Sequence, residues 1–95
     1  MSKAKGSRAE LRCIRILETA GYICTKAGGS LGVFDVIALG PLDIRAVQVK
    51  SGGEYLSKVE REIICDLSLA ENVSRECWRF PDYCRAPLIE VLKAH

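Results

Sequence analysis

Three side chains in this chain could form a chemically active site. Asp35 is an acid, and thirteen residues later come two polar residues, Gln48 with Lys50 close behind. Each belongs to a segment rich in β-branched and other apolar residues, and a Gly-Pro turn joins the two segments. If Leu39 pairs with Ile44 across that turn, Asp35 lies directly opposite Gln48. Lys50 joins the same face because side chains alternate along a strand. The predicted hairpin therefore brings a carboxylate, an amide oxygen and an ammonium group together.

These groups are typical of a site for a hard cation. A bare carboxylate in an apolar strand is costly unless it is paired or bound to a metal. Asp35 and the Gln48 side-chain oxygen are suitable ligands for Mg²⁺, and Lys50 could orient a water or stabilise charge on a phosphate. The alternative, which spacing alone favours, is a plain cross-strand ion pair between Asp35 and Lys50, with Gln48 as an exposed neighbour.

A first helix is predicted to bring a second acid to this place. Ser7 and Glu10 have the spacing of a capping box, so the helix should run from about Arg8 to Ala20. Glu10 shares the face of the apolar stripe, which consists of Cys13, Ile14, Leu17 and Ala20. Glu10 could complete the outer shell of a metal or handle protons; alternatively it only closes the capping box.

The remaining elements follow from apolar periodicity and turn residues. A second capping box, Ser57–Glu60, opens a helix to about Glu71 that should bury Val59, Ile63, Leu67 and Ala70. Strands are expected at Tyr22–Lys26, Val33–Leu39, Ile44–Lys50, Glu76–Phe80 and Pro87–Leu92, the last with a short helix as the alternative. The order α-β-β-β-α-β(-β) indicates a single α/β domain over residues 1–95, with one mixed sheet flanked by helices.

Composition excludes several classes of protein. A chain of 95 residues with 48% hydrophobic and 27% charged residues is typical of one globular domain. No apolar run approaches the ~18 residues of a membrane span, and the N-terminus has no signal-peptide core, so we expect an intracellular protein without membrane association. Five cysteines without Cys-x-x-Cys spacing, and one histidine, give little support for zinc and indicate reduced, mostly buried thiols.

Charge is distributed unevenly along the chain. Residues 1–50 hold eight Lys and Arg against four Asp and Glu, whereas residues 51–95 hold six against eight. Residues 1–6 form a basic arm that is expected to be mobile. This asymmetry hints at a polyanion-binding side. The glycine loop at 28–32 lacks the Gly-Lys-Ser/Thr ending of a P-loop, so no nucleotide cofactor is expected.

Five short motifs, in order over residues 5–51, resemble those of the archaeal-type Holliday junction resolvases of the PD-(D/E)XK nuclease superfamily. They are Lys5–Glu10, Gly21-Tyr22, Lys26–Ser30, Phe34–Ala38 and Val47–Ser51. Residues 52–95 agree with that family only in their helix-then-strand layout. The resemblance implies a restriction-endonuclease-like core. It also implies a Mg²⁺-dependent endonuclease, with Mn²⁺ as a substitute, that cuts four-way DNA junctions as a homodimer in recombination and repair.

The resemblance also assigns roles to particular residues. Asp35 would be the central metal ligand and Lys50 the catalytic lysine, with Glu10 as the acid of the first helix. Ser30 would be the loop serine near the scissile phosphate, and Lys26 holds roughly the position of a basic loop residue. The implied DNA-binding residues are Lys3, Lys5, Arg8, Lys26 and Ser30.

Gln48 departs from the family pattern, which usually has Glu at this position. An amide oxygen can still bind Mg²⁺, but the substitution removes one negative charge from a ligand set of Asp35, Gln48 and Glu10. It leaves open a non-catalytic module that binds junctions or other nucleic acid. A nuclease preferring flaps, nicks or other branched DNA also remains open.

Three segments have no single role that the sequence assigns. Apolar residues around Val59–Leu69 and Trp78–Phe80 are candidates for a dimer interface, although core packing explains them nearly as well. Pro81–Ala86, with Arg79 and Arg85 nearby, is either a DNA-contacting loop or an ordinary surface turn.

Overall fold

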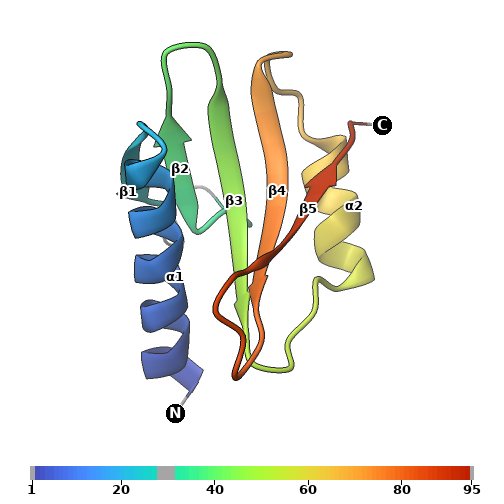
Figure 1. Ribbon diagram of the computed structural model, residues 1–95. Coiled ribbons are helices and arrows are strands. Elements are labelled where there is room, and N and C mark those ends of the chain that lie inside the picture. Colours follow the sequence, from blue (N-terminus) through green and yellow to red (C-terminus); the bar gives the residue numbers. More distant parts are fainter. Residues whose placement is uncertain (1, 28–31, 95) are drawn as a thin grey trace.

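Figure 1 shows the computed structural model, which describes the backbone of residues 2–27 and 32–94 and the side chains from Arg8 onward. Its elements are α1 (Ser2–Thr19), β1 (Ile23–Lys26), β2 (Val36–Leu39), β3 (Ile44–Ser51), α2 (Lys58–Asp66), β4 (Val73–Phe80) and β5 (Leu88–Leu92). The five strands form one sheet in the order β1-β2-β3-β4-β5. Only β3 and β4 are parallel, because α2 connects them as a crossover. The predicted mixed α/β fold, with a strand at its end, is confirmed.

The register of the β2–β3 hairpin is the one that the sequence predicts. Leu39 pairs with Ile44, and the ladder continues as far as Val36 opposite Val47. Alternation along β3 therefore sends Val47 and Val49 to the face covered by α1. The residues between and beyond them, Gln48 and Lys50, belong to the other face.

Two apolar clusters hold the layers together. On the first face, α1 packs on β2, β3 and β4 through a cluster around Cys13, Leu17, Val47 and Trp78. On the second face, α2 packs on the sheet through a cluster that includes Phe34, Ala46, Ile64, Cys65 and Leu92. All five cysteines are free, and Cys13, Cys65 and Cys77 are buried as expected.

The first helix begins earlier than predicted. Residues 2–7 are helical, so α1 starts at Ser2 and Ser7 does not cap it. The predicted basic arm is therefore the first part of the helix. Ala and Lys are good helix formers, and a glycine inside a helix costs only about 1 kcal/mol, so Gly6 does not stop it. Cys13 and Leu17 lie in the core as predicted, whereas Ala20 is exposed.

The second helix is capped as predicted but is shorter and differently rotated. Ser57 and Glu60 make both hydrogen bonds of the capping box. However, Ile64 and Cys65 are the buried residues, and Val59 and Ile63, predicted for the core, are exposed. The helix ends at Asp66 because the buried Arg75 guanidinium donates hydrogen bonds to the carbonyls of its last turn. Tertiary structure thus overrides the longer apolar pattern.

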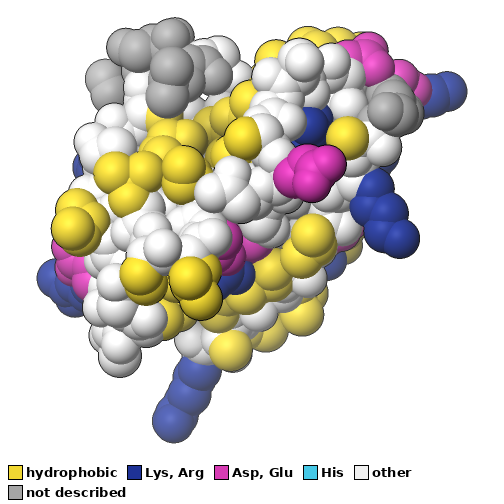
Figure 2. Space-filling model, turned by 90° about the horizontal axis from the view of Figure 1, so that it is seen from above, with side chains coloured by type: hydrophobic (Ala, Val, Ile, Leu, Met, Phe, Trp, Pro, Cys, Tyr) yellow, Lys and Arg dark blue, Asp and Glu magenta, His cyan; other side chains and the backbone are white. Residues whose placement is uncertain are grey.

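Apolar side chains also gather at one end of the molecule. Figure 2 looks down on the end that carries the β2–β3 turn and shows several hydrophobic groups there, interrupted by charged ones. Exposed residues of this end include the cross-strand pair Ile23 and Leu39, together with Leu42 in the turn. The C-terminal ends of β3 and β4 lie at the opposite end (Figure 1). Within the described ranges, no helix is long and apolar enough to cross a membrane.

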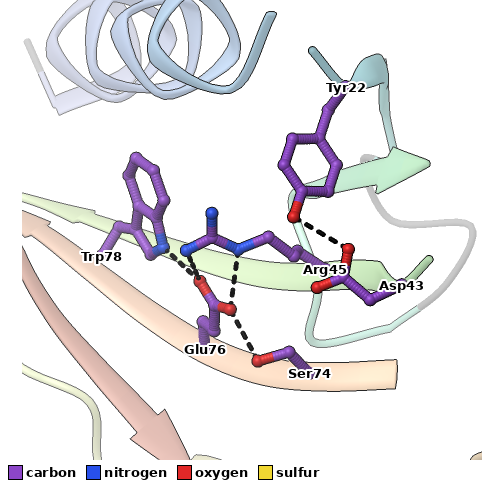
Figure 3. A network of polar contacts seen from close by, with 6 residues as sticks. All are labelled: Tyr22, Asp43, Arg45, Ser74, Glu76 and Trp78. Carbon is purple, nitrogen blue, oxygen red and sulfur yellow. Dashed lines mark hydrogen bonds and ion pairs between the residues drawn. The ribbon is translucent and has the colours of Figure 1, made fainter. Parts of the chain in front are cut away.

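A buried ionic network ties β3 to β4 beneath α1 (Figure 3). Glu76 is 2% exposed, and its carboxylate accepts two hydrogen bonds from Arg45 at 2.8 Å. It accepts two more, from the Ser74 hydroxyl at 2.6 Å and from the Trp78 indole at 2.8 Å. Burial acts to raise the pKa of Glu76, but these donors together lower it. The carboxylate is therefore buried in its charged form with four hydrogen bonds.

Arg45→Leu is predicted to lower the free energy of unfolding at pH 7 by about 3–5 kcal/mol, because it leaves the Glu76 carboxylate buried without its cation. In the wild type the lowered pKa of Glu76 stabilises the fold above the ordinary carboxyl pKa. In the variant, burial is no longer offset by Arg45, so the pKa of Glu76 rises. The difference in unfolding free energy between the two proteins should therefore shrink as the pH falls and Glu76 binds a proton. Urea unfolding at pH 7 and at pH 4 measures both effects.

Arg61→Ala is the matched control, because Arg61 forms a comparable two-point ion pair with Glu90 on the surface. Exposed ion pairs contribute little, so this variant should lose no more than about 1 kcal/mol. Equal losses in the two variants would contradict the role of the buried network.

Candidate functional site

Asp35 is fixed at the point where the β2–β3 ladder ends. It lies in a bend just before β2, not inside the strand as predicted. Its peptide N–H donates to the carbonyl of Val47 at 2.8 Å, and its carbonyl accepts from Ala27 at 2.8 Å. Its carboxylate Oδ2 accepts the N–H of Val49 at 2.8 Å. Because these bonds reach the residues on either side of Gln48, Asp35 lies opposite Gln48 as predicted.

Gln48 is buried, with 8% of its surface exposed, and this excludes the alternative in which it is a solvated neighbour. Its side-chain oxygen Oε1 has no hydrogen-bond partner among the described residues. A buried acceptor left unpaired costs about 1–3 kcal/mol, and such an atom in a well-packed protein calls for an explanation. An unpaired acceptor opposite a carboxylate fits a site for a cation.

Lys50 does not form the simple ion pair with Asp35 that spacing alone favours. Its ammonium group lies 3.0 Å from Glu60 Oε2, in the first turn of α2. The other oxygen of Glu60 accepts the N–H of Ser57 and closes the capping box. Both groups are partly shielded from solvent, so the contact is stronger than a surface ion pair. Lysine has three donors, so two remain for a substrate.

Glu10 and Lys26 are within electrostatic reach of this group. Burial raises the pKa of Glu10, the negative charge of Asp35 raises it further, and the ammonium group of Lys26 partly offsets both. The first helix thus carries its acid within electrostatic reach of Asp35. Lys26, the last residue of β1, pairs with Val36 and is exposed beside the site.

The electrostatics of Asp35 suit a cation. Burial raises the pKa of its carboxyl group, and the Val49 N–H and the Lys50 charge act in the opposite direction. The nearby carboxylates of Glu60 and Glu54 raise the pKa again. These carboxylates add negative charge next to Asp35, which a divalent cation would neutralise.

The donor set fits a hard cation, although it is poorer in charge than a set of acids. No group of three or more His, Cys, Asp or Glu residues that could hold a metal occurs among the described residues. The predicted set of Asp35, Gln48 and Glu10 has two carboxylates, and its third oxygen would come from the Gln48 amide. All three atoms are of the oxygen type that Mg²⁺ prefers, and the unpaired Oε1 is the observation that favours their use.

Some of the predicted residues lie outside the description. Ser30 is not among the described residues, and neither are the side chains of Lys3 and Lys5, whose backbone belongs to α1. Arg8 is exposed on the same helix, close to Glu10 in the chain. The roles of these four residues stay predictions.

Glu60 is the site residue that the sequence does not reveal. Its spacing from Ser57 identifies the capping box, but nothing in a one-dimensional pattern indicates a second contact with Lys50. The available signal is positional: β3 ends at Ser51, and α2 opens seven residues later at Lys58. So short a connection keeps the first turn of the helix near the strand end.

Comparison with known proteins identifies the fold. No protein-family model and no curated protein sequence matches this chain. Among solved structures, the Holliday junction resolvase Hjc of the archaeal hyperthermophile Archaeoglobus fulgidus matches it with a TM-score of 0.71 and 20% sequence identity. The match covers 94% of this chain and 72% of the resolvase. The resemblance seen in residues 5–51 is thus confirmed for the fold: this chain has the architecture of an archaeal Holliday junction resolvase.

Proposed function

We propose that this chain is a metal-dependent endonuclease that cuts branched DNA, with the four-way junction as its first substrate. The observation that carries the proposal is the buried and unpaired Gln48 oxygen opposite Asp35, at the end of β3 from which Lys50 extends. The shared fold with a resolvase supports the class of substrate. A DNA substrate also implies an intracellular location.

Asp35, Gln48 and Glu10 would hold one Mg²⁺ ion, with Mn²⁺ as a substitute. When bound, this ion would neutralise phosphate charge and lower the pKa of a nearby water. Asp35 is positioned for this role by its three backbone hydrogen bonds, which restrict both its main chain and its carboxylate. Oδ2 already accepts the Val49 N–H, so Oδ1 would be the oxygen available to a ligand.

Lys50 would stabilise the charge that develops on the phosphate during hydrolysis. Its contact with Glu60 holds the ammonium group at one place, which reduces the entropy lost on reaching the transition state. Glu10 would either complete the shell of the ion or, when it is not bound to the ion, accept a proton from a water.

DNA would approach the end of the sheet where β3 and β4 finish. Arg8 and Lys26 are exposed near Glu10 and would contact phosphates, with Lys3, Lys5 and Ser30 as further predicted contacts. Phosphate contacts release counterions, so binding should weaken steeply with salt.

Two incisions in one junction would require two copies of the chain, because each copy carries one such site. Of the two readings left open for Trp78 and Phe80, interface or core, burial selects the core, because these side chains are 1% and 4% exposed. Val59 and Ile63 of α2 are exposed, so the α2 surface is the part of the proposed homodimer interface that the fold leaves accessible.

A second candidate function is junction binding without cleavage. The observation that favours it is the amide at position 48 in place of an acid, which removes charge from the ligand set. The restricted geometry of Asp35 and the contact that holds Lys50 would give no advantage to a protein that only binds.

Asp35→Asn is predicted to abolish Mg²⁺-dependent cleavage of a labelled four-way junction, lowering kcat by on the order of 10³ or more. The amide oxygen can still accept the Val49 N–H, so the variant should fold. Glu10→Gln should reduce kcat to a smaller extent. Glu18→Gln, an exposed acid two turns further along α1, is the matched control and should cleave normally. Full cleavage by Asp35→Asn would refute the assignment.

Gln48→Glu is predicted to lower the Mg²⁺ concentration needed for half-maximal cleavage, because it restores a negative ligand. Without metal, the variant should melt below the wild type, since it buries another carboxylate beside Asp35. Mg²⁺ should then raise its melting temperature more than that of the wild type. Thermal unfolding in EDTA and across a Mg²⁺ series measures this separately from activity. If the two proteins need the same Mg²⁺ concentration for half-maximal cleavage, Gln48 does not belong to the ligand set.

Glu60→Gln is predicted to lower kcat by about tenfold while leaving KM nearly unchanged, because Lys50 remains present but loses its charged partner. Lys50→Ala should lose more, on the order of 10²–10³. Glu62→Gln, on the same helix, serves as the control for the removal of a charge from α2. The opposite pattern, a raised KM with normal kcat, would show that Glu60 acts in binding and does not position Lys50.

A further inference from the structure

A groove of about 340 Å³ lies beside the candidate site, on the face of the sheet that α1 covers. Arg8 and Arg12 of α1 form one wall, and the loop at 81–84 after β4 forms the other. Ser51 lies at its base and directly follows Lys50 in the chain. Because Ser51 and Phe80 are the last residues of β3 and β4, the groove opens at the end of the sheet that also carries Lys50, which extends from the opposite face.

The loop is held in place by the first helix. The Arg12 guanidinium donates hydrogen bonds to the carbonyls of Arg85 at 2.6 Å and Cys84 at 3.4 Å. The same guanidinium lies 4.9 Å from the centre of the Phe80 ring. A turn within the loop is closed by the bond from the Cys84 N–H to the Pro81 carbonyl at 3.3 Å. The loop therefore has a defined shape and is not an arbitrary surface turn.

Tyr83 is displayed by this loop in an unfavourable conformation. Its φ of +67° is positive, which a bulky residue rarely adopts, and no other non-glycine residue of the described ranges shares this feature. Its side chain is fully exposed, with no burial to compensate for the strain. Strained residues that gain nothing from the fold occur preferentially at sites of function.

The charge of the groove and the exposed ring of Tyr83 together suit one kind of ligand, a nucleotide with an open base face. Arg8 and Arg12 outweigh the one carboxylate of the lining, Asp82, so the groove is suited to a phosphate. An exposed aromatic ring stacks on a nucleobase, but inside a continuous duplex both faces of each base are already covered by neighbours. Only a branch point, a nick or a strand end offers an open base face.

We infer that Tyr83 stacks on an open base at a DNA branch point while Arg8 holds the adjacent phosphate, and that this contact makes the protein prefer branched DNA to continuous duplex. The inference rests on the proposed function and deepens it. It assigns to the loop at 81–84 the selection of DNA structure, separately from the residues that would carry out cleavage.

The test measures binding in EDTA, where cleavage does not occur. The probes are a four-way junction with 2-aminopurine at the branch point and a continuous duplex of matched length. Tyr83→Asn is the main variant, because Asn tolerates a positive φ and lacks the ring. It should bind the junction about tenfold more weakly, with little change for the duplex, and the 2-aminopurine should fluoresce more strongly in its complex.

Tyr83→Phe keeps the ring and should retain both the preference and the quenching, so it is the matched control. Arg8→Ala should weaken binding to both DNAs alike and reduce the salt dependence by about one phosphate contact. A wild type that prefers the junction, with a Tyr83→Asn variant that keeps this preference and the quenching, overturns the inference and leaves the proposed function standing. A wild type without any preference for the junction contradicts both.

Discussion

The geometry of the candidate site depends on one hydrogen bond, from the peptide N–H of Val49 to the carboxylate of Asp35. Where the regular ladder between β2 and β3 stops, this side chain takes over as the acceptor for the strand. Because the acid is part of the sheet, it cannot rotate away from Gln48 without leaving a backbone donor unpaired. The sheet thus positions the acid with the precision of its own backbone.

The same end of the molecule collects parts from both layers. α1 brings Glu10 from one face, and the first turn of α2 brings Glu60 from the other. The parallel pair β3 and β4 lies between them, and the Arg45–Glu76 network under α1 ties these two strands together at depth (Figure 3). Acids from both helices therefore lie at the C-terminal end of a strand that is anchored to its neighbour nearer its start.

Much of this arrangement is predictable from the sequence, because strand register and capping boxes are local patterns. The pairing of Leu39 with Ile44 places Asp35 opposite Gln48, and Ser57 marks the start of α2. Features that depend on tertiary contacts are not predictable in this way. Arg75 ends α2 early by binding its carbonyls, and Glu60 serves two partners at once. The amino-acid sequence alone does not show which residue far along the chain will form a hydrogen bond with a given group.

The double use of Glu60 has a consequence for motion. One of its oxygens completes the helix cap and the other holds Lys50, so the first turn of α2 cannot fray without releasing the lysine. Helix ends open with small free energies, on a timescale that amide hydrogen exchange can follow. Exchange at the amides of this turn would therefore report how often the lysine leaves its position. Local opening of the first turn of α2 is thus coupled to the position of the Lys50 side chain at the end of β3.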